Sequence, residues 1–264
     1  MRVRANGIDI HCEVDGAGPW VVLSHALACR LEMWDEQVRA LRSRFRILRF
    51  DTRGHGTTST SPAPYTLELL ADDLEGLLAA LGIERAHFVG ISLGGMVSQV
   101  YALKYPQRVA SLVLCDTTSR YTEGADKIWQ ERIAGVRAQG MVPVVAPTLE
   151  RWFTPSFRTA KPDLMAKVGE MIRTTPAEGY IGCGGAVPTI DTTDRLKQIA
   201  SPTLVIVGAQ DAGTPPAMAL TIQRSIPGAE LQLIPSASHL SNLEQPDAFN
   251  RVLVEFLDRV STPP

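Results

Sequence analysis

The chain has 264 residues, 45% of them hydrophobic and 20% charged, and its 26 lysines and arginines nearly balance its 28 aspartates and glutamates. This composition excludes a disordered chain, which would lack the apolar residues that offset ordering entropy, and it is typical of a folded domain with a sizeable core. The net charge of −2 provides no basic excess, so we expect a small organic partner rather than a nucleic acid or an anionic membrane.

Short apolar runs alternate with helical patterns along the chain, which predicts a mostly parallel β-sheet with helices on both faces. The predicted strands are residues 8–14, 20–24, 47–50, 86–90, 109–115, 203–207 and 230–234. Buried parallel strands are nearly continuous in apolar residues, and the run Leu-Val-Ile-Val at 204–207 fits that description. The sequence therefore predicts an α/β fold.

Three helices are predicted between these strands. The clearest begins after Thr66, a suitable N-cap, and carries leucines along one face with its acidic residues largely off that face. Gly82 follows at the C′ position, where a helix commonly ends. The other two helices are expected at residues 94–105 and 246–260.

Residues 119–195 interrupt the alternation of strands and helices. The stretch is helical in character and contains Trp129, Trp152 and several arginines, but no strand is predicted in it. We interpret it as an insertion that lies over the sheet and shapes a pocket. The predicted architecture is a core domain formed by residues 1–118 and 196–264, with a helical lid, or cap, at 119–195.

The pentapeptide Gly-Ile-Ser-Leu-Gly at residues 90–94 matches the Gly-x-Ser-x-Gly pattern of a nucleophilic serine. A predicted strand ends at Gly90 and a predicted helix begins at Gly94, so Ser92 falls on the sharp turn between them. Bulky neighbours would collide in such a strained turn, which explains the two glycines. This context disfavours a chance glycine-rich turn, and Ser92 is the candidate nucleophile.

A serine hydroxyl needs a general base, and five histidines are available. His239 directly follows the last predicted strand and is the candidate base. We expect His55 to organise the loop that contains it and His25 to lie near the loop that binds the oxyanion. His11 and His87 fall within predicted strands, where we expect surface positions or partners in the protein.

The base in turn needs a carboxylate that fixes its tautomer and stabilises the imidazolium. Asp211 follows the strand at 203–207 and gives the chain order Ser, Asp, His. Asp116, directly after the strand at 109–115, is the rival position for the acid. Asp191 and Asp194 have the character of turn residues. We favour Asp211.

Two backbone amides are expected to bind the negative charge that develops on the substrate oxygen. One is the N–H of Leu93, the residue after the nucleophile, and the other is the N–H of Leu27, in the loop after the strand at 20–24. Because these groups belong to the main chain, the identity of the side chains matters little.

The four cysteines are far apart and form no Cys-x-x-Cys pair, so neither a zinc site nor a disulfide framework is supported. No signal-like stretch stands at the N-terminus, and no run of about 20 apolar residues occurs. We expect free buried thiols, no bound metal and a cytoplasmic protein. The cysteines are Cys12, Cys29, Cys115 and Cys183.

Several segments together resemble the 3-oxoadipate enol-lactonases, a family of the α/β-hydrolase superfamily. Gly-x-Ser-x-Gly at 90–94 and Arg-Gly-His-Gly at 53–56 are shared across the superfamily, whereas Arg-Trp-Phe-Thr-Pro at 151–155 and residues 239–250 are more particular to this branch. The resemblance covers almost the whole chain. It implies an α/β-hydrolase fold and cofactor-independent opening of a lactone in aromatic-compound catabolism, the β-ketoadipate pathway.

The sequence departs from that family at two places. Ala28 stands where the family usually has glycine, and residues 183–189 lack an arginine that would help bind a substrate carboxylate. Another lid arginine is then expected to take its place. Arg132 and Arg151 are the best placed, because Trp129 and Trp152 beside them would form walls of a pocket; Arg137, Arg158 and Arg173 are further candidates.

Two other functions stay open from the sequence. A broad-specificity carboxylesterase, with or without perhydrolase side activity, would use the same residues but needs no cation in the lid. A binding protein that keeps these residues for ligand recognition would leave Ser92 unreactive. Dehalogenases and epoxide hydrolases need aspartate at that position and are disfavoured. The sequence leaves the oligomeric state open between a monomer and a homodimer.

Overall fold

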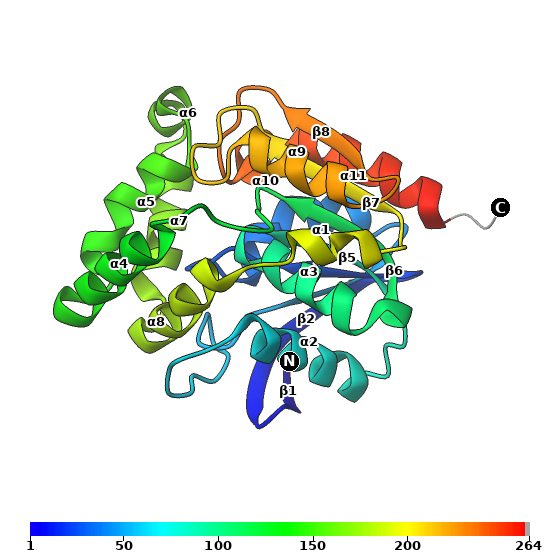
Figure 1. Ribbon diagram of the computed structural model, residues 1–264, viewed down its shortest axis with the longest axis horizontal. Helices are drawn as coiled ribbons and strands as arrows, with labels where there is room; N and C mark the ends of the chain where they lie inside the picture. The colour runs from blue at the N-terminus through cyan, green and yellow to red at the C-terminus, as the bar shows by residue number, and fades with distance from the viewer. Residues whose placement is uncertain (262–264) are drawn as a thin grey trace.

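The computed structural model describes residues 1–261, which contain one sheet of eight strands (Figure 1). The strands lie in the order β1-β2-β4-β3-β5-β6-β7-β8. β2 pairs antiparallel with both β1 and β4, and every pair from β4 to β8 is parallel. Their bounds are β1 Arg2–Ala5, β2 Ile8–Gly16, β3 Trp20–Ser24, β4 Arg46–Phe50, β5 Ala86–Ile91, β6 Val109–Cys115, β7 Thr203–Gly208 and β8 Glu230–Ile234.

The expectation of a mostly parallel α/β sheet is confirmed. Each of the predicted strands is present within two residues of its expected bounds. The sequence does not predict β1, because this edge strand is short, largely exposed and without an apolar run. β5 and β7 are buried along their whole length, as strands covered on both faces should be.

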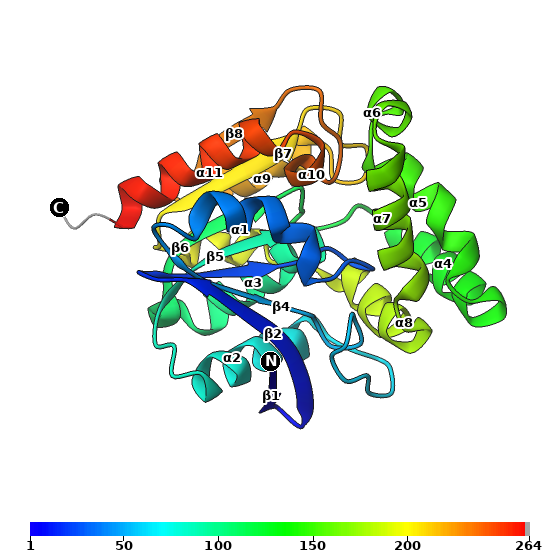
Figure 2. The ribbon, with the colours of Figure 1, turned by 180° about the vertical axis from the view of Figure 1, so that it is seen from behind.

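Helices cover both faces of the sheet. α3 and α9 lie on one face, with α2 against α3 (Figure 1), and α1 and α11 lie on the other (Figure 2). Thr66 begins α2 as expected, since its hydroxyl accepts from Leu69 N at 3.0 Å, and Gly82 follows the helix end at φ +67°. The bounds are α1 Asp35–Leu41, α2 Leu67–Ala80, α3 Leu93–Lys104, α9 Pro216–Ser225, α10 Ser241–Glu244 and α11 Pro246–Ser261.

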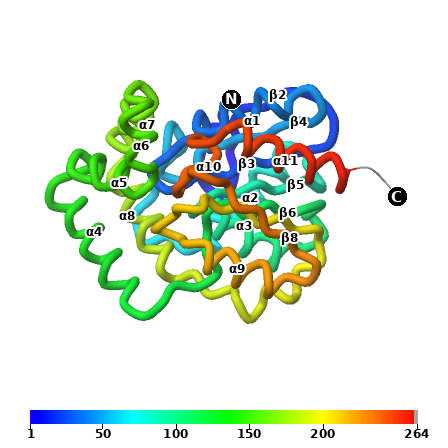
Figure 3. The backbone as a smooth tube through the Cα atoms, turned by 90° about the horizontal axis from the view of Figure 1, so that it is seen from above, coloured from blue at the N-terminus to red at the C-terminus, as the bar shows by residue number. Residues whose placement is uncertain are grey.

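The helices of residues 119–195 gather at one end of the molecule, beside the sheet rather than on its faces (Figure 3). The two ends of this stretch meet, because Arg120 pairs with Asp191 at 2.5 Å and Asp194 at 2.6 Å. We propose the division into a core (1–118 and 196–264) and a lid (119–195) and use these names below. The lid helices are α4 Ala125–Gln139, α5 Val145–Trp152, α6 Pro155–Ala160, α7 Pro162–Thr174 and α8 Ala177–Ala186.

The four cysteines are free and buried, as expected. Burial raises the pKa of the Cys29 and Cys183 thiols, so both are protonated and unreactive at neutral pH. Residues 1–261 contain no group of three His, Cys, Asp or Glu side chains arranged to hold a metal ion. None of their helices combines the length and the apolar character needed to cross a membrane.

Candidate active site

Ser92 stands on a sharp turn between the end of β5 and the start of α3. Its backbone has φ +54° and ψ −117°, a conformation that residues with a Cβ rarely adopt. A Cβ on Gly90 would collide with the Gly94 carbonyl, and a Cβ on Gly94 would collide with the Ser24 carbonyl. The two glycines of the pentapeptide are therefore required by close backbone approach, as the sequence predicts.

Ser92, His239 and Asp211 form one chain of hydrogen bonds. His239 Nε2 lies 2.9 Å from Ser92 Oγ, and His239 Nδ1 lies 2.8 Å from Asp211 Oδ2. The three residues follow β5, β8 and β7, so the carboxyl ends of parallel strands bring them together although they are far apart in sequence. The arrangement supplies a hydroxyl, a base in contact with it and an acid that orients the base.

The environment of Asp211 keeps it ionised. Its carboxylate accepts hydrogen bonds from Gly213 N at 2.8 Å, from Thr214 N at 3.0 Å and from the Thr214 hydroxyl at 2.7 Å. Burial alone would raise the pKa of Asp211, but the charge of His239 and these hydrogen bonds hold that pKa below its usual value. The sequence does not predict the contribution of Thr214.

The same pairing makes His239 a stronger base. Burial alone would lower the pKa of His239, but the charge and hydrogen bond of Asp211 raise it above the usual value for histidine. The ring is almost completely enclosed, and the Trp152 ring stacks against it with centroids 6.2 Å apart. His239 is thus held in place from the core by Asp211 and from the lid by Trp152.

Asp116, the rival for the acid, makes other contacts. Its carboxylate accepts from Gly208 N at 2.7 Å and from the Ser241 hydroxyl at 2.5 Å, and in residues 1–261 no hydrogen bond joins it to His239. Burial, together with repulsion from Asp211, raises the pKa of Asp116 well above its usual range. Asp116 therefore links the end of β7 to the start of α10, while Asp211 contacts the base.

The other four histidines lie away from the Ser92 hydroxyl. His11 and His87 lie in β2 and β5, as expected, with hydrogen-bond partners in the protein. His25 and His55 are fully buried next to the loop that follows β3, and their ring centroids are 5.2 Å apart. Only His239 contacts Ser92 among the histidines.

The amides of Leu27 and Leu93 are free in the described part of the chain, since neither donates to a protein group. Leu93 is the first residue of α3, and the first N–H groups of a helix lack partners within it. Leu27 lines the same cavity as Ser92 and His239. Both amides are therefore without a protein acceptor among the described residues, and their role as an oxyanion hole stays a prediction.

A cavity of about 500 Å³ lies between the core and the lid and contains Ser92 and His239 in its wall. It is lined by the four lid residues that the sequence places first: Trp129, Arg132, Arg151 and Trp152. Tyr121, Thr148 and Tyr180 also line it and are not predicted, because nothing in the sequence distinguishes them from other lid residues. Arg137, Arg158 and Arg173 do not line it.

The two arginines of the cavity have no carboxylate partner within residues 1–261. The Arg132 guanidinium lies over the Trp129 ring, 4.8 Å from its centre, and Arg151 donates to the Thr148 hydroxyl at 3.0 Å. Burial and the nearby charge of Arg132 lower the pKa of Arg151. Neither guanidinium forms an ion pair among residues 1–261, although Glu123 also lines the cavity, and two cations at one cavity suit an anionic ligand.

Comparison with known proteins places this site among hydrolases. Residues 19–246 match the sequence model of a family described as alpha/beta hydrolase fold. The 3-oxoadipate enol-lactonase 2 of Acinetobacter baylyi is 35% identical over 241 residues, covering 91% of this chain and 89% of that protein. The resemblance seen in the sequence is thereby confirmed.

Solved structures give the same result. The enol-lactonase of Burkholderia xenovorans LB400 is 36% identical, with a TM-score of 0.95, and the match covers 98% of this chain and 100% of that one. A malate-bound thermophilic esterase from Thermogutta terrifontis is 33% identical, with a TM-score of 0.95 and coverage of 99% and 100%. The similar proteins therefore include a lactonase and an esterase.

Proposed function

The chain belongs to the α/β-hydrolase family and is an enzyme that hydrolyses an ester or a lactone, and from that premise we propose that its substrate is 3-oxoadipate enol-lactone. The observation that carries the proposal is the cavity itself. It holds the Ser92–His239–Asp211 chain on one side and two arginines without carboxylate partners on the other. The enol-lactonase relatives at 35% and 36% identity support the same substrate class.

In the proposed mechanism, Ser92 Oγ attacks the lactone carbonyl while His239 Nε2 accepts its proton. The negative charge on the carbonyl oxygen is bound by the amides of Leu27 and Leu93, and Asp211 stabilises the imidazolium. The ring C–O bond then breaks, and His239 returns the proton to the departing enol oxygen. The acyl chain stays on Ser92, and the enol at its other end tautomerises to the ketone.

The second half of the reaction releases the acid. His239, neutral again, takes a proton from water, and the hydroxide formed attacks the acyl carbon of the Ser92 ester. The same two amides bind the oxyanion, and His239 protonates Ser92 Oγ as the acyl bond breaks. The product leaves as a dicarboxylate, and no step needs a cofactor.

The lid arginines are proposed to bind the carboxylate that the enol-lactone already carries. A buried carboxylate loses its hydration, and a guanidinium with two parallel donors is the side chain that best replaces it. Arg132 and Arg151 face the cavity from α4 and α5, and Trp129 and Trp152 beside them form its apolar walls.

A broad-specificity carboxylesterase is the second candidate, and one observation favours it. Val187 lines the cavity at the end of α8, in the segment where the resemblance leads us to expect an arginine. The malate-bound esterase relative at 33% identity fits this alternative equally well.

One kinetic comparison separates the two candidates. We would measure kcat/KM for the enol-lactone and for its methyl ester, which has the same ring but lacks the charge. A charge-assisted contact is worth roughly 1.5–3 kcal/mol, so the lactonase should prefer the anion by about ten- to a hundredfold. Equal rates on both, together with fast turnover of a neutral aryl ester, would favour the esterase.

Labelling of Ser92 tests the chemistry without assuming a substrate. A fluorophosphonate that reacts with activated serines should label the wild-type protein at Ser92. Absence of labelling would contradict both hydrolase candidates and favour the binding protein instead.

A further inference from the structure

The loop after β3 contains a tight turn with an unfavourable residue in it. Cys29 N donates to Ala26 O at 3.0 Å, which closes a β-turn with Leu27 and Ala28 at its centre. Ala28 has φ +60°, whereas Leu27 is not among the residues with positive φ. A positive φ at the third position alone is the type II arrangement, which favours glycine there because a Cβ is strained.

A buried histidine holds the central peptide of this turn. Ala28 N donates to His55 Nε2 at 3.0 Å, and His55 Nδ1 lies 3.2 Å from Arg53 O. An amide can only donate, so Nε2 must be unprotonated, and the ring proton is on Nδ1, which donates to the Arg53 carbonyl. Burial and the neighbouring charge of His25 lower the pKa of His55 to about 3, so the ring keeps this neutral form at ordinary pH.

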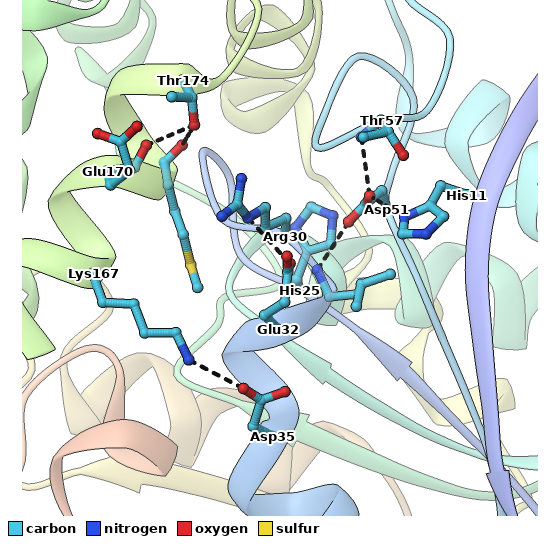
Figure 4. A network of polar contacts seen from close by, with 12 residues as sticks. His11, His25, Arg30, Glu32, Asp35, Asp51, Thr57, Lys167, Glu170 and Thr174 are labelled. Carbon is cyan, nitrogen blue, oxygen red and sulfur yellow. Dashed lines mark hydrogen bonds and ion pairs between the residues drawn. The ribbon is translucent and has the colours of Figure 1, made fainter. Parts of the chain in front are cut away.

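The C-terminal side of the turn makes further polar contacts. The Thr175 hydroxyl, between α7 and α8, lies 2.9 Å from Met171 O and 3.3 Å from Ala28 O, so the two carbonyls share its one hydrogen. Beyond the turn, Asp51 accepts from Leu31 N at 2.9 Å and contacts the His11 ring at 2.8 Å (Figure 4). The strained peptide therefore lies inside a rigid polar frame, and His55 is the group that contacts its N–H directly.

We propose that His55 is a positioning residue of the oxyanion hole. By accepting from Ala28 N it holds the 26–29 turn in the form that presents the Leu27 N–H to the acyl oxygen. Without that acceptor, the strain at Ala28 would be relieved by a rearrangement of the whole 26–29 turn, which moves the Leu27 N–H away from the acyl oxygen. The inference rests on the proposed function, in which Ser92 attacks and Leu27 binds the oxyanion.

Two variants of His55, to glutamine and to asparagine, both keep a polar amide in the buried site. They differ in whether that amide can still accept from Ala28 N. In His55→Gln the amide oxygen reaches the position of Nε2 and can still accept from Ala28 N. In His55→Asn the shorter side chain reaches only the position of Nδ1, near Arg53 O. Only the asparagine variant should lose the contact with the turn.

The readout compares a transition-state mimic with a ground-state mimic. A trifluoromethyl ketone adds to Ser92 and forms an oxyanion, whereas the corresponding alcohol fills the same cavity without one. Removing an oxyanion donor costs on the order of 10²–10³ in kcat, so His55→Asn should lose at least about tenfold in kcat and in affinity for the ketone. KM and the affinity for the alcohol should stay within about threefold, and His55→Gln should retain most of both.

The Ala28→Gly variant, used as a second background for His55→Asn, tests the turn itself and guards against a variant that fails to fold. Glycine accepts positive φ without strain, so His55→Asn should lose less activity in Ala28→Gly than in the wild type. Equal losses in the two backgrounds would contradict the proposed relaxation. His87→Gln is the matched control, because His87 is a buried histidine bonded to Ser111 and far from the turn in sequence.

The outcomes distinguish this inference from the proposed function. If the fluorophosphonate labels Ser92 but His55→Asn changes ketone and alcohol binding equally, the positioning role is wrong and the hydrolase assignment stands. If His87→Gln lowers the ketone-to-alcohol affinity ratio as much as His55→Asn does, the effect is general destabilisation and the inference is also wrong. If Ser92 is not labelled in the wild type, the proposed function itself fails.

Discussion

The charged side chains that the core contributes to the cavity pair with one another, whereas the two lid arginines of the cavity, Arg132 and Arg151, form no ion pair among residues 1–261. Asp211 accepts from Gly213, Thr214 and His239, and His239 contacts Ser92. Across the same cavity, Arg132 lies over the Trp129 ring and Arg151 donates to the Thr148 hydroxyl. The core side chains of the cavity are thus hydrogen-bonded to one another, whereas the two lid guanidiniums can still bind an anionic group of a ligand.

The two regions meet at a few buried contacts. Glu244, at the end of α10, accepts from Ser238 N at 2.8 Å next to the base and from Thr154 N at 3.0 Å in the lid. Leu240 N donates to Trp152 O at 3.3 Å. The loop that carries His239 is therefore bonded directly to the lid, so displacement of the lid would move the base.

Ser92→Ala should have the largest effect and would test the core alone. The Ser92 hydroxyl bonds only to His239 and contributes nothing to the apolar core, so the variant should fold with unchanged stability. Loss of the nucleophile in comparable enzymes lowers kcat by on the order of 10⁶. Turnover of an aryl ester above about a hundredth of the wild-type rate would show that another group is the nucleophile.

Asp211→Asn should follow, with a loss on the order of 10⁴ in kcat as in comparable triads, because the amide leaves the imidazolium unstabilised. Asp116→Asn should retain activity. Its amide oxygen can still accept from Gly208 N, and its NH₂ group can donate to the Ser241 hydroxyl. The measurement is kcat on an aryl ester, and a larger loss in Asp116→Asn would assign the acid to that position.

The pH dependence of the rate should reflect the raised pKa of His239. The base must be neutral to accept a proton, so kcat/KM should rise with pH through a pKa above the ordinary value of about 6.5. Asp211 and Asp116 raise this pKa and Arg151 lowers it. In Asp211→Asn the charge that raises the pKa of His239 is gone, while burial still lowers that pKa. The rise of kcat/KM with pH should therefore move to lower pH.

The free energy of unfolding should fall with rising pH over the same pH range in which kcat/KM rises. A histidine whose pKa is raised by folding stabilises the protein fully below its unfolded pKa, and this contribution is lost as pH rises through the folded pKa. At pH values where Asp211 stays ionised, the His239–Asp211 pair therefore stabilises the fold more at the low-pH end of this range than at the high-pH end. Urea unfolding of wild type and Asp211→Asn across this range would check the sign, and a pair contribution that grows with pH would contradict it.

Sequence predicts the core well because its information is local. A buried strand is an apolar run. Ser92 directly follows such a strand, and Asp211 and His239 lie in the loops that follow β7 and β8. Contacts that join distant segments leave no such pattern: nothing near His55 shows that its ring accepts from Ala28. In the lid, the sequence supplies the arginines and tryptophans, but their direction depends on how the helices pack.

Arg151→Ala and Arg132→Ala should affect the anionic substrate selectively, because each removes a charge that the lid offers to the cavity. KM for the enol-lactone should rise by roughly ten- to a hundredfold, equivalent to about 1.5–3 kcal/mol, while the neutral methyl ester is spared. Arg137→Ala is the matched control, since Arg137 is exposed on α4 outside the cavity. If the ratio of the activity on the enol-lactone to that on its methyl ester is unchanged in all three variants, the esterase proposal would be favoured over the lactonase proposal.

The smallest effects are expected from two glycines of α8, and they test where the lid depends on the core. Gly179 lies against Gly54 in the core, and a Cβ there would collide with the Gly54 carbonyl, so the backbone must move.

Gly185 of the same helix is the matched control. A Cβ at Gly185 would have Ile133 Cδ1, a side chain of the lid itself, as its nearest neighbour at 4.0 Å. Gly179→Ala should therefore destabilise the protein by about 1–3 kcal/mol, as overpacked sites do, and lower kcat by displacing the lid. Gly185→Ala should stabilise it by about 0.4–1 kcal/mol, because alanine restricts the unfolded chain and suits a helix, and should leave kcat unchanged. Urea unfolding with kcat on an aryl ester measures both, and equal effects at the two positions would mean that the lid does not rest on the core through this glycine contact.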